Sequence, residues 1–122
     1  MQPRVFGDLS VEVREDTGTV RLDFRGKSNL RQPELHLVPF FSEVTNRARS
    51  ANAAVEMHFE ALEFFNSSTI TSIIQYVKDL REKKIRLTVV FNPHNKWQKI
   101  FFDALWIFDK GDGLFTVQSV RG

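Results

Sequence analysis

The sequence predicts an α/β fold in two layers, a mixed β-sheet of about five strands with helices mainly on one face. The chain opens with two alternating runs around a turn signal, which is typical of an antiparallel hairpin. Strand and helix patterns then alternate, which favours right-handed crossovers and a mostly parallel sheet. Polar residues alternate with apolar ones on several strands, which indicates that one face of the sheet is partly exposed to solvent. We expect a single domain over residues 1–122.

The opening hairpin is predicted to pair Leu9–Val13 with Val20–Phe24 around the turn signal Asp16-Thr17-Gly18. In both strands every second residue is apolar, so one face of the hairpin should be buried. A polar loop over Gly26–Gln32 follows, and it ends at Pro33, which suits the first turn of a helix.

The first helix is predicted to run to about Ala51, because its apolar residues follow helical spacing. They are Leu37, Phe40, Phe41, Val44 and Ala48. Pro39 lies inside this pattern and predicts either a later start or a kink. Val55–Phe59 alternates between apolar and polar residues and is predicted to be a strand, in which His58, beside Glu56 and Glu60, forms a surface cross-strand pair.

The second helix has the cleanest apolar stripe of the chain, with spacing i, i+3, i+4, i+7. The stripe consists of Ile70, Ile73, Ile74, Val77 and Leu80. The helix should begin at the cluster Asn66–Thr69 and end in Arg81-Glu82-Lys83-Lys84, whose cations complement the helix dipole.

The rest of the chain is predicted to form a strand, a third helix, a turn and a last strand. These are Ile85–Phe91, Trp97–Phe108, Asp109–Gly113 and Leu114–Val120. The third helix carries large apolar residues on more than one face, which fits either an interface or burial, and the oligomeric state stays open.

Composition narrows the class of protein. Apolar residues make up 42% and charged residues 26%, a balance typical of globular domains. The net charge of only +2 makes nucleic-acid binding unlikely. No segment approaches the roughly 20 apolar residues that cross a bilayer, and Met1–Asp8 lacks the apolar run of a secretory signal. We therefore expect a cytoplasmic protein with no membrane partner.

The chain shows no pattern typical of catalysis, a cofactor or a metal site. The three histidines, His36, His58 and His94, fall in three different predicted elements, and there is no Cys. Glu60 and Glu63 fit solvated loop acids better than a general acid and base. Gly111 and Gly113 flank a turn with no phosphate-binding Lys-Ser/Thr after them. We expect no enzyme activity, no cofactor and no bound metal.

A modest basic group lies late in the second helix and early in the third. Its members are Lys78, Arg81, Lys83, Lys84, Arg86, Lys96 and Lys99. A solvated face is the simpler interpretation, and docking of an acidic partner or a nucleotide remains open.

The most informative stretch is Phe64-Phe65-Asn66-Ser67-Ser68-Thr69, where three hydroxyl residues open the second helix. One capping residue would suffice to satisfy a helix N-terminus. Free N–H groups and the positive dipole end there favour a phosphate. Two interpretations follow, a plain helix cap or a phospho-acceptor on Ser67 or Ser68, and the spacing does not choose between these serines.

This stretch, with the strand Val55–Phe59 before it and the strand Ile85–Phe91 after its helix, resembles the STAS domains of anti-sigma-factor antagonists. It is more similar still to SiaC-type regulators, which are STAS-like domains tied to biofilm and cyclic-di-GMP signalling. Asn66 stands where the anti-sigma-factor antagonists usually have Asp, and Thr69 where they usually have Gly. The SiaC-type motif has Asn at this position.

The resemblance implies a switch protein. A kinase of the histidine-kinase-like ATPase fold would phosphorylate one serine, with Ser67 the first choice as acceptor and Ser68 the second, and a PP2C-type phosphatase would reverse this. The unphosphorylated form would bind its target, a diguanylate cyclase or an anti-sigma factor, through a surface formed by Phe64, Phe65, Asn66 and Thr69. The alternative is a stand-alone nucleotide-binding or scaffold domain.

Overall fold

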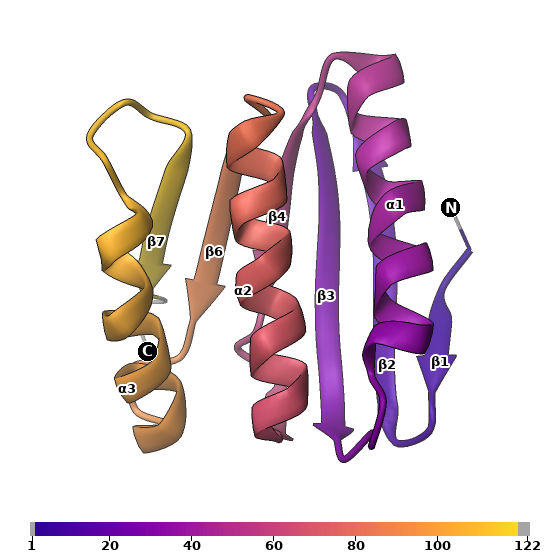
Figure 1. The fold of residues 1–122 in the computed structure, drawn as a ribbon, viewed down its shortest axis with the longest axis vertical. Helices are drawn as coiled ribbons and strands as arrows, with labels where there is room; N and C mark the ends of the chain where they lie inside the picture. Colours follow the sequence, from indigo (N-terminus) through magenta and orange to yellow (C-terminus); the bar gives the residue numbers. More distant parts are fainter. Residues whose placement is uncertain (1, 120–122) are drawn as a thin grey trace.

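The computed structural model describes residues 2–119, which form one mixed β-sheet with helices on one face (Figure 1). The strands are β1 (Arg4–Phe6), β2 (Leu9–Asp16), β3 (Thr19–Ser28), β4 (Ala54–His58), β5 (Leu62–Phe65), β6 (Leu87–Phe91) and β7 (Phe115–Ser119). The helices are α1 (Glu34–Ala51), α2 (Ser67–Glu82) and α3 (Lys96–Leu105), and a 3-10 turn, η1 (Trp106–Phe108), follows α3.

The sheet has the order β1-β2-β3-β4-β6-β7, and β5 pairs with the far end of β3. The first three strands are antiparallel neighbours, whereas β4, β5, β6 and β7 join the sheet in parallel. Each helix follows one of the parallel strands and returns along the sheet, so α1, α2 and α3 all begin at the same edge (Figure 1). The predicted two-layer α/β fold with a mixed sheet is confirmed.

The predicted number of about five strands is wrong, because β1 and β5 were missed. β1 has three residues, too few to show an alternation. β5 continues the direction of β4 after an interruption at residues 59–61, and its two middle residues, Glu63 and Phe64, are both exposed. Short strands without a period-2 pattern carry no sequence signal of their own.

Three boundaries also differ from the sequence prediction. β3 runs on to Ser28, so the first residues of the predicted loop 26–32 are strand. Pro39 is exposed inside α1, which begins at Glu34 in spite of it. The third helix ends as an α-helix at Leu105 and tightens into η1. Val120, predicted as the end of the last strand, lies outside the described residues.

The core lies between the sheet and the helices and is rich in aromatic side chains. Phe24 stacks on Phe59 with ring centroids 4.6 Å apart, and Phe59 contacts Phe102 of α3 at 5.0 Å. Phe41 of α1 stacks on Tyr76 of α2 at 4.1 Å. These rings join α3 to the sheet and α1 to α2, and each fully buried aromatic side chain stabilises the fold by roughly 1.5–3 kcal/mol.

The other face of the sheet is polar, as the alternation predicted. Arg21 donates three hydrogen bonds to the carboxylate of its neighbour two residues on, Asp23, at 3.0–3.2 Å. The ring nitrogens of His58 lie 2.8 Å from Glu56 Oε1 and 3.0 Å from Glu60 Oε1, so the predicted cross-strand pairing is wrong: His58 pairs with neighbours two residues away on its own stretch. These paired polar side chains allow this face of the sheet to remain exposed to solvent.

Gln98, which is fully buried in α3, connects three backbone segments. Its Nε2 donates to the carbonyl oxygens of Phe59 (2.8 Å) and Leu62 (2.9 Å). Its Oε1 accepts the amide N–H of Asn92 at 2.8 Å. The amide of Gln98 therefore has its polar atoms paired despite burial, and it links the end of β6 to the segment between β4 and β5.

Gly26 permits the close approach of β3 to the β1–β2 turn. Its φ is +84°, and a Cβ at this position would stand 2.1 Å from the carbonyl oxygen of Asp8. Lys27 N donates to that same oxygen at 3.2 Å. The bulge in the β3–β5 pairing falls between Gly26 and Lys27, so this glycine sets the register with which β5 joins the sheet.

We expect Gly26→Ala to lower the free energy of unfolding by more than ~2 kcal/mol, since it combines a left-handed backbone with a clash against backbone atoms. Urea denaturation measures the difference. Gly18→Ala is the matched control: its φ is +82°, but nothing lies within 4 Å of the added Cβ, so only about 1 kcal/mol should be lost. Equal losses for the two variants would show that the Asp8 contact does not matter.

Candidate functional site

The edge at which all three helices begin is the natural place for a site in this fold. It is the carboxyl end of the parallel strands, where the sheets of α/β proteins commonly bind ligands. The loops β3–α1, β5–α2 and β6–α3 meet there, at the lower edge in Figure 1. The first turn of α2, with its three hydroxyl residues, belongs to this edge.

Asn66 caps α2 and fixes the preceding loop. Its Oδ1 accepts the N–H of Thr69 at 3.0 Å and the hydroxyl of Thr69 at 2.7 Å. Its Nδ2 donates to the carbonyl oxygen of Leu30 at 2.9 Å, which joins the cap to the β3–α1 loop. All the polar atoms of the Asn66 side chain are thus used within the protein, and the predicted cap is confirmed.

Thr69 ties the first turn of α2 to the end of β3. Its hydroxyl lies 2.6 Å from that of Ser28, and both residues are buried. Asn66 N donates to the carbonyl oxygen of Ser28 at 3.0 Å, so a backbone hydrogen bond also joins the end of β3 to the start of α2. Of the three hydroxyl residues that open the helix, Thr69 is therefore structural.

Ser67 and Ser68 are both exposed, at the first and second positions of α2. Their amides belong to the N–H groups that have no partner within a helix, and the first turn of α2 holds no acidic residue. An anion attached to either hydroxyl would meet the positive end of a 16-residue helix with no competing carboxylate in that turn.

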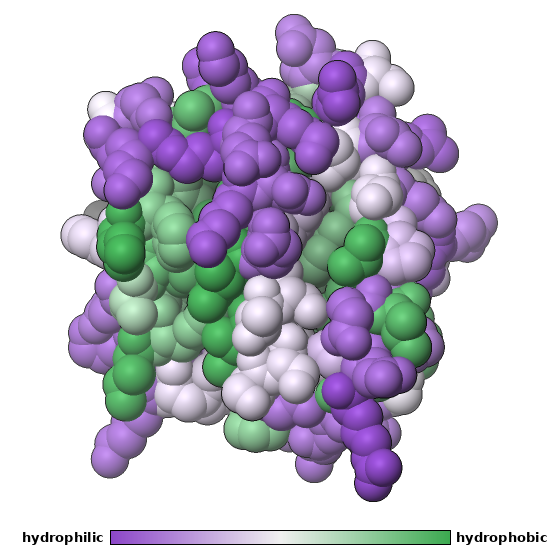
Figure 2. Space-filling view, in the orientation of Figure 1, coloured by the Kyte–Doolittle hydropathy of each residue, from purple (hydrophilic) through white to green (hydrophobic). Residues whose placement is uncertain are grey.

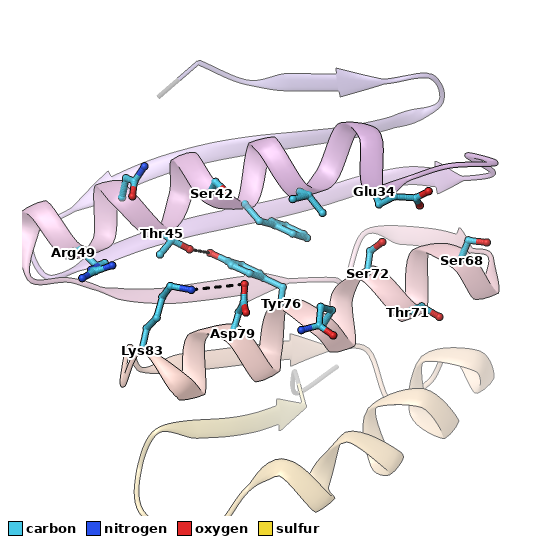
Figure 3. A pocket seen from close by; sticks show the side chains of 14 residues that line it. Glu34, Ser42, Thr45, Arg49, Ser68, Thr71, Ser72, Tyr76, Asp79 and Lys83 are labelled. Carbon is cyan, nitrogen blue, oxygen red and sulfur yellow. Dashed lines mark hydrogen bonds and ion pairs between the residues drawn. The ribbon is translucent and has the colours of Figure 1, made fainter.

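A groove of about 520 Å³ runs between α1 and α2 and distinguishes the two serines (Figure 3). Ser68 lines it at the end where Glu34 stands, whereas Arg49 and Lys83 line the other end. Ser67 is not among the lining residues. Ser68 therefore shares its end of the groove with the Glu34 carboxylate, whereas Ser67 does not line the groove.

Tyr76 forms part of the floor of this groove and is nearly buried. Its hydroxyl lies 3.1 Å from Thr45 Oγ1 of α1. Burial raises the pKa of the Tyr76 phenol, and the hydrogen bond with Thr45 opposes that rise only in part. The side chain is thus a neutral cross-link between the two helices.

Phe64 and Phe65 point to opposite sides of β5. Phe64 is 45% exposed, whereas Phe65 is buried against the rings of Trp97 (4.7 Å) and Phe101 (5.3 Å) of α3. Trp97 Nε1 also donates to the carbonyl oxygen of Glu63 at 2.7 Å. The first turn of α3 is thereby held against β5, beside the start of α2.

Hydrophobic residues gather on the surface over α2 and α3 (Figure 2). Ile70 and Ile74 of α2 and Phe101 of α3 are only partly buried, and Ile100 is 73% exposed.

Of the residues predicted to bind a partner, only Phe64 presents a large exposed side chain. Phe65 and Thr69 are buried, so both can act on a partner only by positioning the loop. Asn66 is half-buried with its amide fully engaged. The sequence analysis did not identify Ser28 as part of the site, since a serine near the end of a strand carries no signal for a contact 41 residues away.

The histidines do not come together. His36 lies on α1 beside Phe6, His58 on the open sheet face, and His94 in the β6–α3 loop. Within residues 2–119 no three His, Asp or Glu residues are grouped as a metal ion would require. No helix in this range is long and apolar enough to span a bilayer.

Comparison with known proteins adds no assignment. The chain matches no family model, and no curated protein matches it. The geometry of the site therefore carries the functional argument.

We expect Asn66→Ala to lower the free energy of unfolding by ~1–3 kcal/mol, because the cap of α2 is lost and the carbonyl of Leu30 loses its partner. Asn66→Asp keeps the acceptor oxygen and should cost less. Asn46→Ala, an exposed position on α1, serves as the control and should stay within ~0.5 kcal/mol. Urea denaturation separates the three, and an unaffected Asn66→Ala would contradict the cap.

Tyr76 is the only tyrosine, so ultraviolet difference spectroscopy reports its ionisation directly. Its raised pKa means that the folded state keeps the proton when the unfolded chain would lose it, so stability should fall as the pH rises above roughly 10. We expect the phenolate signal to appear together with unfolding. A phenolate that forms in the folded protein near pH 10 would contradict this.

Proposed function

We propose that this chain is a non-enzymatic phospho-switch protein with a STAS-like domain of the SiaC type, and that Ser67 is its phospho-acceptor. The observation that carries the proposal is the exposed Ser67 hydroxyl in the first turn of α2, next to the exposed ring of Phe64. A kinase needs such an accessible hydroxyl, and a partner needs such an apolar surface.

Ser67 is favoured over Ser68 by charge. A phosphate brings about −1.5 to −2 charges, and it is destabilised beside a carboxylate. Ser68 shares its end of the α1–α2 groove with Glu34, whereas Ser67 lies outside the groove lining. At Ser67 the phosphate would gain from the N-terminal dipole, an effect of up to ~2 kcal/mol.

The switch would act on an interface and leave the fold unchanged. The cap by Asn66 and the bond between Ser28 and Thr69 hold the first turn in place without using the Ser67 hydroxyl. A phosphate there would be well tolerated by the free protein. A partner packed on Phe64 and the exposed first turn of α2 would have to desolvate a dianion, which opposes docking.

The partners proposed for this mechanism come from the SiaC-type resemblance. They are a kinase of the histidine-kinase-like ATPase fold, a PP2C-type phosphatase, and a diguanylate cyclase or anti-sigma factor as the target of the unphosphorylated form. The exposed apolar side chains Phe64 and Ile100 support a protein target.

A nucleotide-binding or scaffold domain is the second candidate, and the α1–α2 groove favours it. Its volume of about 520 Å³ falls in the range of small-molecule sites, which is roughly 300–1,000 Å³. Its aromatic floor and hydroxyl-bearing walls could hold a ring and a sugar. Saturable nucleotide binding that is unchanged in Ser67→Ala would support this second function.

Phosphopeptide mapping of the chain purified from its native cells tests the acceptor. We expect one phosphate in the wild type and in Ser68→Ala, and none in Ser67→Ala. Both serines are exposed at the start of the same helix, so Ser68→Ala is a matched control. A phosphate retained in Ser67→Ala would show that the acceptor is another residue. If the wild type carries no phosphate under several growth conditions, the hydroxyl residues 67–69 serve only to cap the helix.

Affinity isolation from the same cells tests the switch. A target retained by Ser67→Ala should be recovered at least tenfold less with Ser67→Asp, which corresponds to about 1.4 kcal/mol. Circular dichroism should show the same fold for both variants. Equal recovery with both variants would exclude Ser67 as the switch.

A further inference from the structure

The groove between α1 and α2 is lined mainly by small or polar side chains from the facing sides of the two helices (Figure 3). On α2 these residues follow helical spacing and are Ser68, Ser72, Gln75, Asp79 and Lys83. On α1 the matching series is Glu34, Val38, Ser42, Thr45 and Arg49. Packed helices usually fill such a space with interlocking side chains, whereas hydroxyl side chains this short leave it open.

The floor of the groove is aromatic. The rings of Phe41 and Tyr76 stack in parallel planes with centroids 4.1 Å apart and join the two helices. Val38, which is 54% exposed, adds an apolar wall on α1. An apolar floor with a few polar groups around it is the usual lining of a small-molecule site, because the floor contacts a flat ring and the polar groups orient it.

One end of the groove carries an excess of positive charge. Arg49, in the last turn of α1, and Lys83, at the end of α2, both line this end (Figure 3). Lys83 Nζ lies 3.8 Å from Asp79 Oδ2, in a pair that is partly exposed and therefore weak. Arg49 has no acidic partner among residues 2–119. Two cations against one carboxylate leave one positive charge for an incoming anion.

The opposite end of the groove is unsuited to a second acidic group. Glu34 stands there, together with the neutral hydroxyls of Ser68 and Ser72 (Figure 3). A carboxylate repels a nearby anion, whereas the hydroxyls accept or donate hydrogen bonds to a neutral polar group. This distribution of charge orients a bound molecule, with its acidic group towards Arg49 and its neutral part towards Glu34.

We propose that the α1–α2 groove binds a small molecule made of a flat ring and one acidic group, a carboxylate or a phosphate monoester. Arg49 binds the acidic group, and the ring lies over Tyr76 between Ser42 and Ser72. Ser42 and Arg49 are separated by about 10 Å along α1, so the ring and the acidic group are several bonds apart.

Among nucleotides, the monophosphates fit these limits, whereas a triphosphate brings more negative charge than Arg49 and Lys83 balance. The site goes beyond the proposed phospho-switch and does not depend on it, since Ser67 lies outside the groove lining. Binding in the groove and phosphorylation of Ser67 are therefore separate properties, and each can fail without the other.

Ligand-detected NMR with the full chain tests the site with two matched pairs of probes. AMP and 4-phenylbutyrate carry an acidic group, and adenosine and 4-phenylbutyramide are their neutral analogues. We expect both acids to bind saturably and to compete with each other. The neutral analogues should bind at least tenfold more weakly, which corresponds to about 1.4 kcal/mol. If neither acid binds more tightly than its neutral analogue, the proposal is wrong.

Two pairs of variants locate the binding. Arg49→Ala should weaken the acids at least tenfold, whereas Arg47→Ala should not, since Arg47 is exposed on the same helix, pairs with Glu15 at 3.7 Å and lies outside the groove lining. Ser72→Phe fills the groove and should abolish binding, and Ser50→Phe, an exposed position outside the groove, should not. Circular dichroism checks that each variant folds. Full binding in both Arg49→Ala and Ser72→Phe would contradict the groove as the site.

Discussion

The buried side-chain amide of Gln98 ties α3 both to the break between β4 and β5 and to the end of β6. The break lets β4 pair with one half of β3 and β5 with the other. Gln98 donates to the carbonyls of Phe59 and Leu62 across this break, and a hydrogen bond of this kind contributes about 0.5–1.5 kcal/mol. By filling this role from α3, Gln98 places β5, and hence the first turn of α2, where the Ser67 hydroxyl reaches the surface.

Much of the fold could be predicted from the sequence because its longer elements repeat with a clear period. The stripe from Ile70 to Leu80 and the alternation in β2, β3 and β4 identify a helix and three strands. The parts that were missed depend on contacts distant in sequence. β5 is a strand because the end of β3 and the side chain of Gln98 hold it there, and neither contact leaves a pattern in residues 62–65.

The candidate site was predictable in its chemistry and only partly in its geometry. Asn66 as a cap follows from residue type and position alone. Which neighbouring hydroxyls stay exposed depends on the angle at which α2 meets β3, so the sequence could not show that Thr69 turns inward to Ser28 while Ser67 and Ser68 stay outside. The burial of Phe65 likewise depends on Trp97 and Phe101, more than 30 residues away.

The contacts that attach the C-terminal part of the chain to the sheet affect how this part opens locally. The segment 92–119 is joined to the rest by the β6–β7 ladder, by the bonds of Gln98 and Trp97, by the Arg81–Asp112 ion pair and by its buried side chains, Phe102 among them. Such a segment can detach as one cooperative unit at a free energy below that of global unfolding. Amide hydrogen exchange would then show one shared protection level across α3 and β7, with slower exchange in β3 and β4 at the centre of the sheet.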